Sequence, residues 1–122
     1  MNERIVAAVD DLFFASKIRG TAEQAGLRAD FPRGADALLA AADGEELPRL
    51  FLFDLHAQRY GDLFALAEEL KRDERLRAVP LVGFFSHVHT ELQRRALAAG
   101  FDKVLPRSAF TKNLPDILQG KF

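Results

Sequence analysis

Three short segments of the chain are apolar along their whole length, and they limit the folds open to it: Ile5–Val9, Leu50–Phe53 and Leu81–Phe85. Apolar runs of this length without alternation are typical of strands that are covered on both faces, as in a parallel sheet. Two further segments fit the edges of such a sheet, Leu27–Phe31, in which apolar and polar residues alternate, and the shorter Lys103–Leu105. The sequence therefore predicts a parallel sheet of five strands.

Helical patterns lie between these segments. A stripe of apolar residues at helical spacing runs from Leu63 to Leu70, and a thinner one runs from Leu92 to Ala99. Alanine-rich segments at 13–25 and 35–42 predict two more helices, and a short last helix is expected to begin near Asn113. The alternation predicts an α/β fold of the flavodoxin-like class, a (βα)5 three-layer sandwich with strand order 2-1-3-4-5.

Length, charge and cysteine content exclude several classes of function. The 122 residues predict one domain over 1–122, and the net charge of −1 gives no field that would attract nucleic acid or a membrane surface. The most basic stretch, Lys71–Arg77, interleaves its charges with acids, as a solvated helix end does. The absence of cysteine excludes disulfides and thiolate metal sites, and no apolar run is long enough to span a bilayer. We expect a cytoplasmic protein.

Charged and polar side chains stand where the predicted strands end. Asp10 and Asp11 follow the first strand, Asp54 the third, Ser86 the fourth and Arg107 the fifth. The carboxyl ends of parallel strands share one edge, so these groups are expected to meet in one crevice. Clustered carboxylates repel each other and either take up protons or bind a cation, for which Mg²⁺ is suited. A neutralised Asp54 could then attack a phosphoryl group whose oxygens contact Ser86 and Arg107.

Each of these residues also has a purely structural interpretation, which the sequence leaves open. Asp10 and Asp11 could cap the helix that follows them, and Ser86 could cap the next one. Arg107 could pair with Asp54 in the absence of any ligand. That ion pair would be expected in a site that no longer accepts a phosphoryl group.

Two other groups of side chains lie near the same edge. The histidines His56, His87 and His89 fall in its loops, where exposed loop positions are favoured over a zinc site. Phe13 and Phe14 directly follow the acidic pair. Adjacent helical positions do not both face a core, so one ring could be exposed near the crevice and mark a contact site. We expect instead that an irregular first turn packs both rings inside.

With these residues in place, the chain resembles the receiver domains of two-component response regulators from Ile5 to about Leu118. Val9–Asp11 resembles the acidic pair of that family, Asp54 its phosphoacceptor, and Ser86 its serine or threonine. The segment "AAGFDKVLPRS" at 98–108 resembles the stretch that ends in the family's Lys-Pro. Four matches at the correct strand ends, in the correct order, identify the chain as similar to this family.

The resemblance implies a function and a set of site residues. It implies a phosphorelay protein without enzymatic turnover, which accepts a phosphoryl group from a sensor histidine kinase or phosphotransfer protein and signals to a downstream protein; a homodimer is left open. The implied site consists of the phosphoacceptor Asp54, a magnesium ion held by Asp11, Asp54 and the His56 carbonyl with Asp10 assisting, and the response residues Ser86 and Arg107.

The chain departs from the family's pattern at the positions that carry the response. Arg107 replaces the family's lysine, and Ser108 follows it in place of proline. Val104 occupies the position of the family's switch aromatic, and His87 that of a small residue. Arginine keeps the charge but is planar and longer than lysine. These departures predict an alternative function, a degenerate receiver that binds its partner without phosphorylation.

Overall fold

The computed structural model describes residues 3–44, 46–86 and 90–122. Strands and helices alternate along the chain, in the order β1 (Arg4–Ala8), α1 (Leu12–Gln24), β2 (Arg28–Asp30), α2 (Ala35–Ala42), β3 (Leu50–Asp54), α3 (Leu63–Arg72), β4 (Leu81–Phe85), α4 (Thr90–Ala98), β5 (Lys103–Pro106), α5 (Arg107–Lys112) and α6 (Leu114–Leu118). The five strands pair in parallel in the order β2-β1-β3-β4-β5, which confirms the predicted topology.

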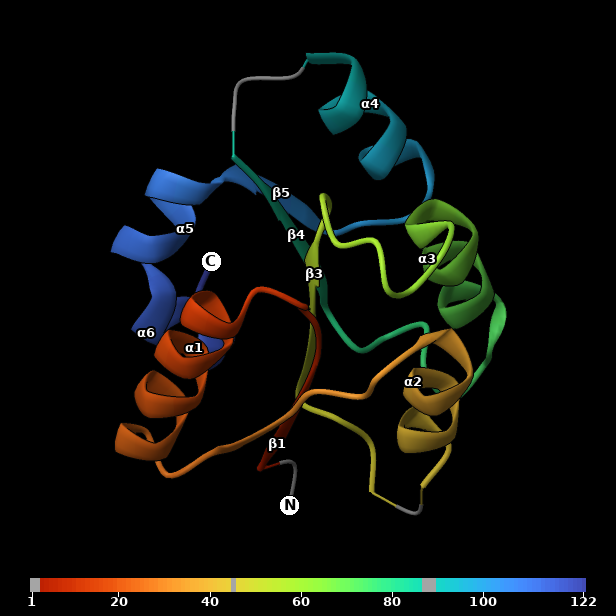
Figure 1. Ribbon diagram of the computed structural model, residues 1–122. Coiled ribbons are helices and arrows are strands. Elements are labelled where there is room, and N and C mark those ends of the chain that lie inside the picture. Colours follow the sequence, from red (N-terminus) through yellow and green to blue (C-terminus); the bar gives the residue numbers. More distant parts are fainter. Residues whose placement is uncertain (1–2, 45, 87–89) are drawn as a thin grey trace.

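Helices cover both faces of the sheet. α1, α5 and α6 lie on one face, and α2, α3 and α4 lie on the other (Figure 1). Because side chains alternate along a strand, the central strands contribute to both cores: in β3, Leu50 and Leu52 face α1 and α6, whereas Phe51 and Phe53 face α2 and α3. This arrangement explains why the central strands are apolar at every position.

The C-terminal segment differs from the sequence prediction. A helix begins near Asn113 as expected, but it is preceded by a separate helix, α5, that starts directly at Arg107. The buried Phe110 holds α5 against the sheet. Pro115 has no backbone N–H with which to extend α5, so the chain breaks at Asn113 and starts α6 with the proline in its first turn.

None of the helices in the described part of the chain is long and apolar enough to cross a membrane.

Candidate functional site

Asp54 is the last residue of β3 and lies in the interior. It is 3% exposed, and it is the only residue with a charged side chain that is buried among those that the structure describes. The alternation along β3 directs its side chain to the face covered by α1 and α5. Its Oδ1 atom accepts a hydrogen bond of 2.9 Å from the backbone N–H of His56. The strand end thus presents a carboxylate held in one orientation.

Two opposing effects set the acidity of this carboxyl. Burial raises the pKa of Asp54 above its ordinary value of 3.8, and this effect is the largest. The His56 N–H bond and the positive charge of Arg107 lower the pKa, but they do not cancel the effect of burial. The negative charge of Asp10 raises it slightly further.

Arg107 begins α5 and places its guanidinium group between two carboxylates. Its Nη2 atom lies 3.6 Å from Asp54 Oδ2 and 3.9 Å from Asp11 Oδ2, distances of ion pairs rather than of good hydrogen bonds. The Cζ atom lies 4.7 Å from the centre of the Phe14 ring and 5.9 Å from that of Phe84, close enough for cation–π attraction. Its Nε atom is buried and has no hydrogen-bond partner in the described structure. Arg107 is therefore fixed both by acids and by aromatic rings.

Asp11 has a structural role as well as a place in the site. Its Oδ1 atom accepts a hydrogen bond of 3.1 Å from the backbone N–H of Phe14 and so caps the first turn of α1. Its Oδ2 atom faces Arg107. The predicted capping role is confirmed for Asp11, and the same residue contributes to the charged cluster.

Asp10 links two loops at this edge of the sheet. Its Oδ2 atom accepts hydrogen bonds from the backbone N–H groups of Gln58, at 3.0 Å, and Arg59, at 3.2 Å. Tyr60, the next residue, is buried, and its hydroxyl donates to the carbonyl oxygen of Pro32. Asp10 therefore does not cap α1; it holds the loop after β3 against the end of β1.

The remaining predicted site residues are Ser86 and the histidines. Ser86 follows β4 and is exposed, and its contact with a phosphoryl group stays a prediction. His56 is exposed and contributes its backbone N–H to Asp54. His87 and His89 lie outside the described residues.

The acidic pair is followed by one buried and one exposed phenylalanine. Phe14 is 9% exposed and packs against Phe84, with 4.9 Å between the ring centres, whereas Phe13 is 92% exposed. The expectation that both rings pack in the core is therefore wrong, because a regular first turn of α1 turns Phe13 to solvent. The stacking of Phe14 on Arg107 was not predicted, since no local pattern links two residues so far apart in the sequence.

The side chains in place do not fit a resident magnesium ion. Within the described ranges, no three histidine, aspartate or glutamate side chains are grouped so that they could hold a metal ion. The carboxylates of Asp11 and Asp54 both face the guanidinium of Arg107, so a cation of the protein already stands between them. The metal ligands predicted from the sequence stay predictions.

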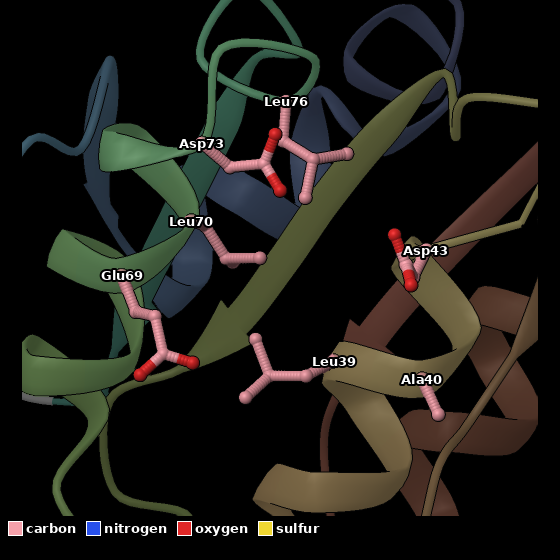
Figure 2. Close-up of a pocket in the computed structure, with 7 residues that line it drawn as sticks. All are labelled: Leu39, Ala40, Asp43, Glu69, Leu70, Asp73 and Leu76. Carbon is pink, nitrogen blue, oxygen red and sulfur yellow. The ribbon is translucent and has the colours of Figure 1, made fainter.

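A hollow between α2 and α3 lies where these two helices end, at the opposite end of the sheet from Asp54. Figure 2 shows Leu39 and Asp43 on one side of it and Glu69, Leu70 and Asp73 on the other. This hollow shares no residue with the cluster around Asp54, and it has no part in the chemistry considered for that cluster.

Replacing Asp54 with asparagine is expected to raise the free energy of unfolding at neutral pH, because the variant has no buried charge. Below pH 3.8 the carboxyl is protonated in both states and adds no pH dependence. As the pH rises from 3.8 towards the raised pKa, the unfolded chain ionises first and the folded wild type loses stability.

Urea unfolding of both proteins from about pH 4 to about pH 8 measures this effect. The advantage of the asparagine variant should grow through the lower part of that range and then level off. A variant that is less stable than the wild type at neutral pH would show that Arg107 and the His56 amide outweigh burial.

Comparison with known proteins supports the fold. No protein-family model and no curated protein matches the chain. Among solved structures, the CheY-like receiver domain protein of Methanospirillum hungatei JF-1 is 19% identical, with a TM-score of 0.80 over 99% of this chain and 94% of that one. CheY4 of Vibrio cholerae, a chemotaxis response regulator, is 15% identical, with a TM-score of 0.82 over the whole of both chains.

A third similar structure contains a metal. The receiver domain of sensor histidine kinase PA1611 from Pseudomonas aeruginosa PAO1 is 18% identical, with a TM-score of 0.81 over 99% of this chain and 98% of that one. That domain has a magnesium ion coordinated in its active site cleft. Together these structures show that the present chain has the CheY-like receiver fold of response regulators.

Proposed function

We propose that the chain is a receiver-type signalling domain that accepts a phosphoryl group on Asp54 and acts by binding another protein. The observation that supports this most directly is the position of Asp54, a buried carboxylate at the carboxyl end of the central strand with a fixed cation beside it. A buried charge is costly, so a structural role alone gives little reason to place one there. The phosphoryl donor would be a sensor histidine kinase or a phosphotransfer protein.

The groups at this end of the sheet supply a nucleophile and two groups that can contact the phosphoryl oxygens. An ionised Oδ atom of Asp54 attacks the phosphorus of a phosphohistidine whose ring is protonated on its other nitrogen. The O–P bond forms, the P–N bond breaks, and the histidine leaves as a neutral imidazole that keeps this proton. The product is an acyl phosphate on Asp54. Its new negative charge lies close to Arg107, and the Ser86 hydroxyl stands at the end of the neighbouring strand. Both groups can stabilise the phosphoryl oxygens.

A second candidate function is a receiver that binds its partner without phosphorylation. The contact of Arg107 with both Asp11 and Asp54 favours it, because the charges of the site are already paired inside the molecule. In this case the cluster would serve to hold α1 and α5 in place.

Incubation with acetyl phosphate followed by intact-mass measurement distinguishes the two functions. The first predicts that the wild type gains one phosphoryl group and that Asp54→Asn gains none. Asp62→Asn is the matched control: Asp62 is an exposed aspartate at the same edge, and asparagine can replace it as the cap of α3. A wild type that stays unmodified, or an Asp54→Asn variant that is still modified, would contradict phosphoryl transfer to Asp54.

A further inference from the structure

We infer that Arg107 is the resident cation of the acidic site and that it excludes Mg²⁺ from the carboxylates at millimolar concentrations. The inference rests on the proposed function in one respect, that Asp11 and Asp54 form the functional site. It does not depend on whether Asp54 accepts a phosphoryl group.

The carboxylate oxygens of this site already have partners within the chain. One oxygen each of Asp11 and Asp54 accepts a backbone N–H, from Phe14 and from His56. The other oxygen of each faces the same nitrogen of Arg107. A magnesium ion needs near-ideal octahedral geometry and gives up its water reluctantly, so it would have to displace the guanidinium and also overcome its charge.

The position of Arg107 is held from the aromatic side as well. Its guanidinium lies over the ring of Phe14 and near that of Phe84, and α5 begins at this residue. Arginine stays charged at any relevant pH, and its planar group stacks on rings in a way that the flexible ammonium of lysine does not. The contact with Phe14 therefore opposes movement of the guanidinium away from the carboxylates.

The charge that balances Asp54 is supplied by the chain itself and is present at all times. Phosphoryl acceptance by Asp54 then has no requirement for magnesium.

Amide NMR during titration with Mg²⁺ alone tests the inference on the full chain. The wild type should show no saturable shifts at Asp11 and Asp54. Arg107→Gln should bind Mg²⁺ at least about tenfold more tightly, as expected when a neighbouring positive charge is removed. These shifts should centre on the two aspartates and disappear in the double variant Arg107→Gln/Asp54→Asn.

Arg77→Gln is the matched control, because it removes the same charge from an exposed arginine at the opposite edge of the sheet. Like the wild type, this variant should show no saturable shifts at Asp11 and Asp54 on addition of Mg²⁺. Phe14→Leu is a second test variant that keeps Arg107 but removes the ring beneath it. This variant should also gain affinity for Mg²⁺, and it serves if Arg107→Gln does not fold.

Two results would overturn the inference. One is a wild type whose affinity for Mg²⁺ matches that of the Arg107→Gln and Phe14→Leu variants. The other is the absence of binding in every folded variant, since Arg107 would then not be what keeps the metal out. Labelling by acetyl phosphate, with and without EDTA, tests phosphoryl transfer independently of the Mg²⁺ titration. If no labelling occurs in either condition, the result counts against phosphoryl transfer and does not alter the interpretation of the titration.

Discussion

Replacing Phe110 with alanine is expected to lower the free energy of unfolding by about 3–5 kcal/mol, the usual range for truncating a buried phenylalanine. The side chain is fully buried. Its ring stacks on that of Phe84 with 4.3 Å between centres and an interplanar angle of 16°, and it lies 5.7 Å from that of Phe14. α5 has six residues, so it depends on this anchor for its place on the sheet. Urea unfolding followed by circular dichroism measures the loss.

Phe13→Ala is the control for this substitution. It removes the same group from a ring that is 92% exposed, and the free energy of unfolding should change by less than about 0.5 kcal/mol. If Phe110→Ala cost no more than Phe13→Ala, α5 would not pack against β4 as described.

Replacing Gly83 with alanine is expected to lower the free energy of unfolding by about 1–3 kcal/mol, the range for overfilling a packed core. A Cβ atom at this position of β4 would lie 2.9 Å from Cε2 of Phe101 and 3.3 Å from Cδ2 of Leu55. The Phe101 ring is buried and meets the Phe53 ring edge-on at 5.4 Å, so it cannot move aside without disturbing a second ring.

The same change at Gly20 should have the opposite sign. Gly20 lies inside α1, and a Cβ atom there would meet nothing within 4 Å. Alanine should therefore raise the free energy of unfolding by about 0.5–1 kcal/mol through its better helix propensity. Thermal unfolding of the two variants and the wild type measures both changes in stability. Equal effects at the two positions would contradict the close packing at Gly83.

The apolar runs carried most of the information about the fold. The segment Leu50–Phe53 was predicted as a strand covered on both faces, and β3 spans it with Asp54 added at its end. Alternation at the edge was also informative, since Ala29 of β2 is buried while Arg28 is exposed. These patterns depend on the repeat of the strand alone, so they can be recognised without knowledge of tertiary contacts.

The stretch Lys71–Arg77 shows a limit of such patterns. Its mixed charges predict a solvated helix end, and α3 does end there with Glu74 and Arg77 exposed. The Lys71 side chain, however, is only 19% exposed, and its Nζ atom lies 2.8 Å from Asp102 Oδ2. The same atom donates to the carbonyl oxygens of Arg77 and Val79. A lysine that fastens the turn before β4 looks the same in the sequence as one that faces water.

The candidate site could also be predicted only in part from the sequence. The positions of Asp54 and Arg107 at strand ends follow from topology, and the structure brings both of them together with Asp11. Their other partners depend on side-chain directions that no local pattern encodes. The stacking of Arg107 on Phe14 and the contact of Asp10 with backbone amides of the loop after β3 belong to this second group.

The buried ring of Tyr60 makes the loops around Asp10 observable without a label. The chain contains one tyrosine and no tryptophan, so its ultraviolet fluorescence arises almost wholly from this residue. The ring is 2% exposed, its hydroxyl is bound to Pro32, and the preceding residue, Arg59, donates its backbone N–H to Asp10. Any event that loosens Asp10 should therefore change the intensity or lifetime of the emission, which provides a spectroscopic signal native to the protein.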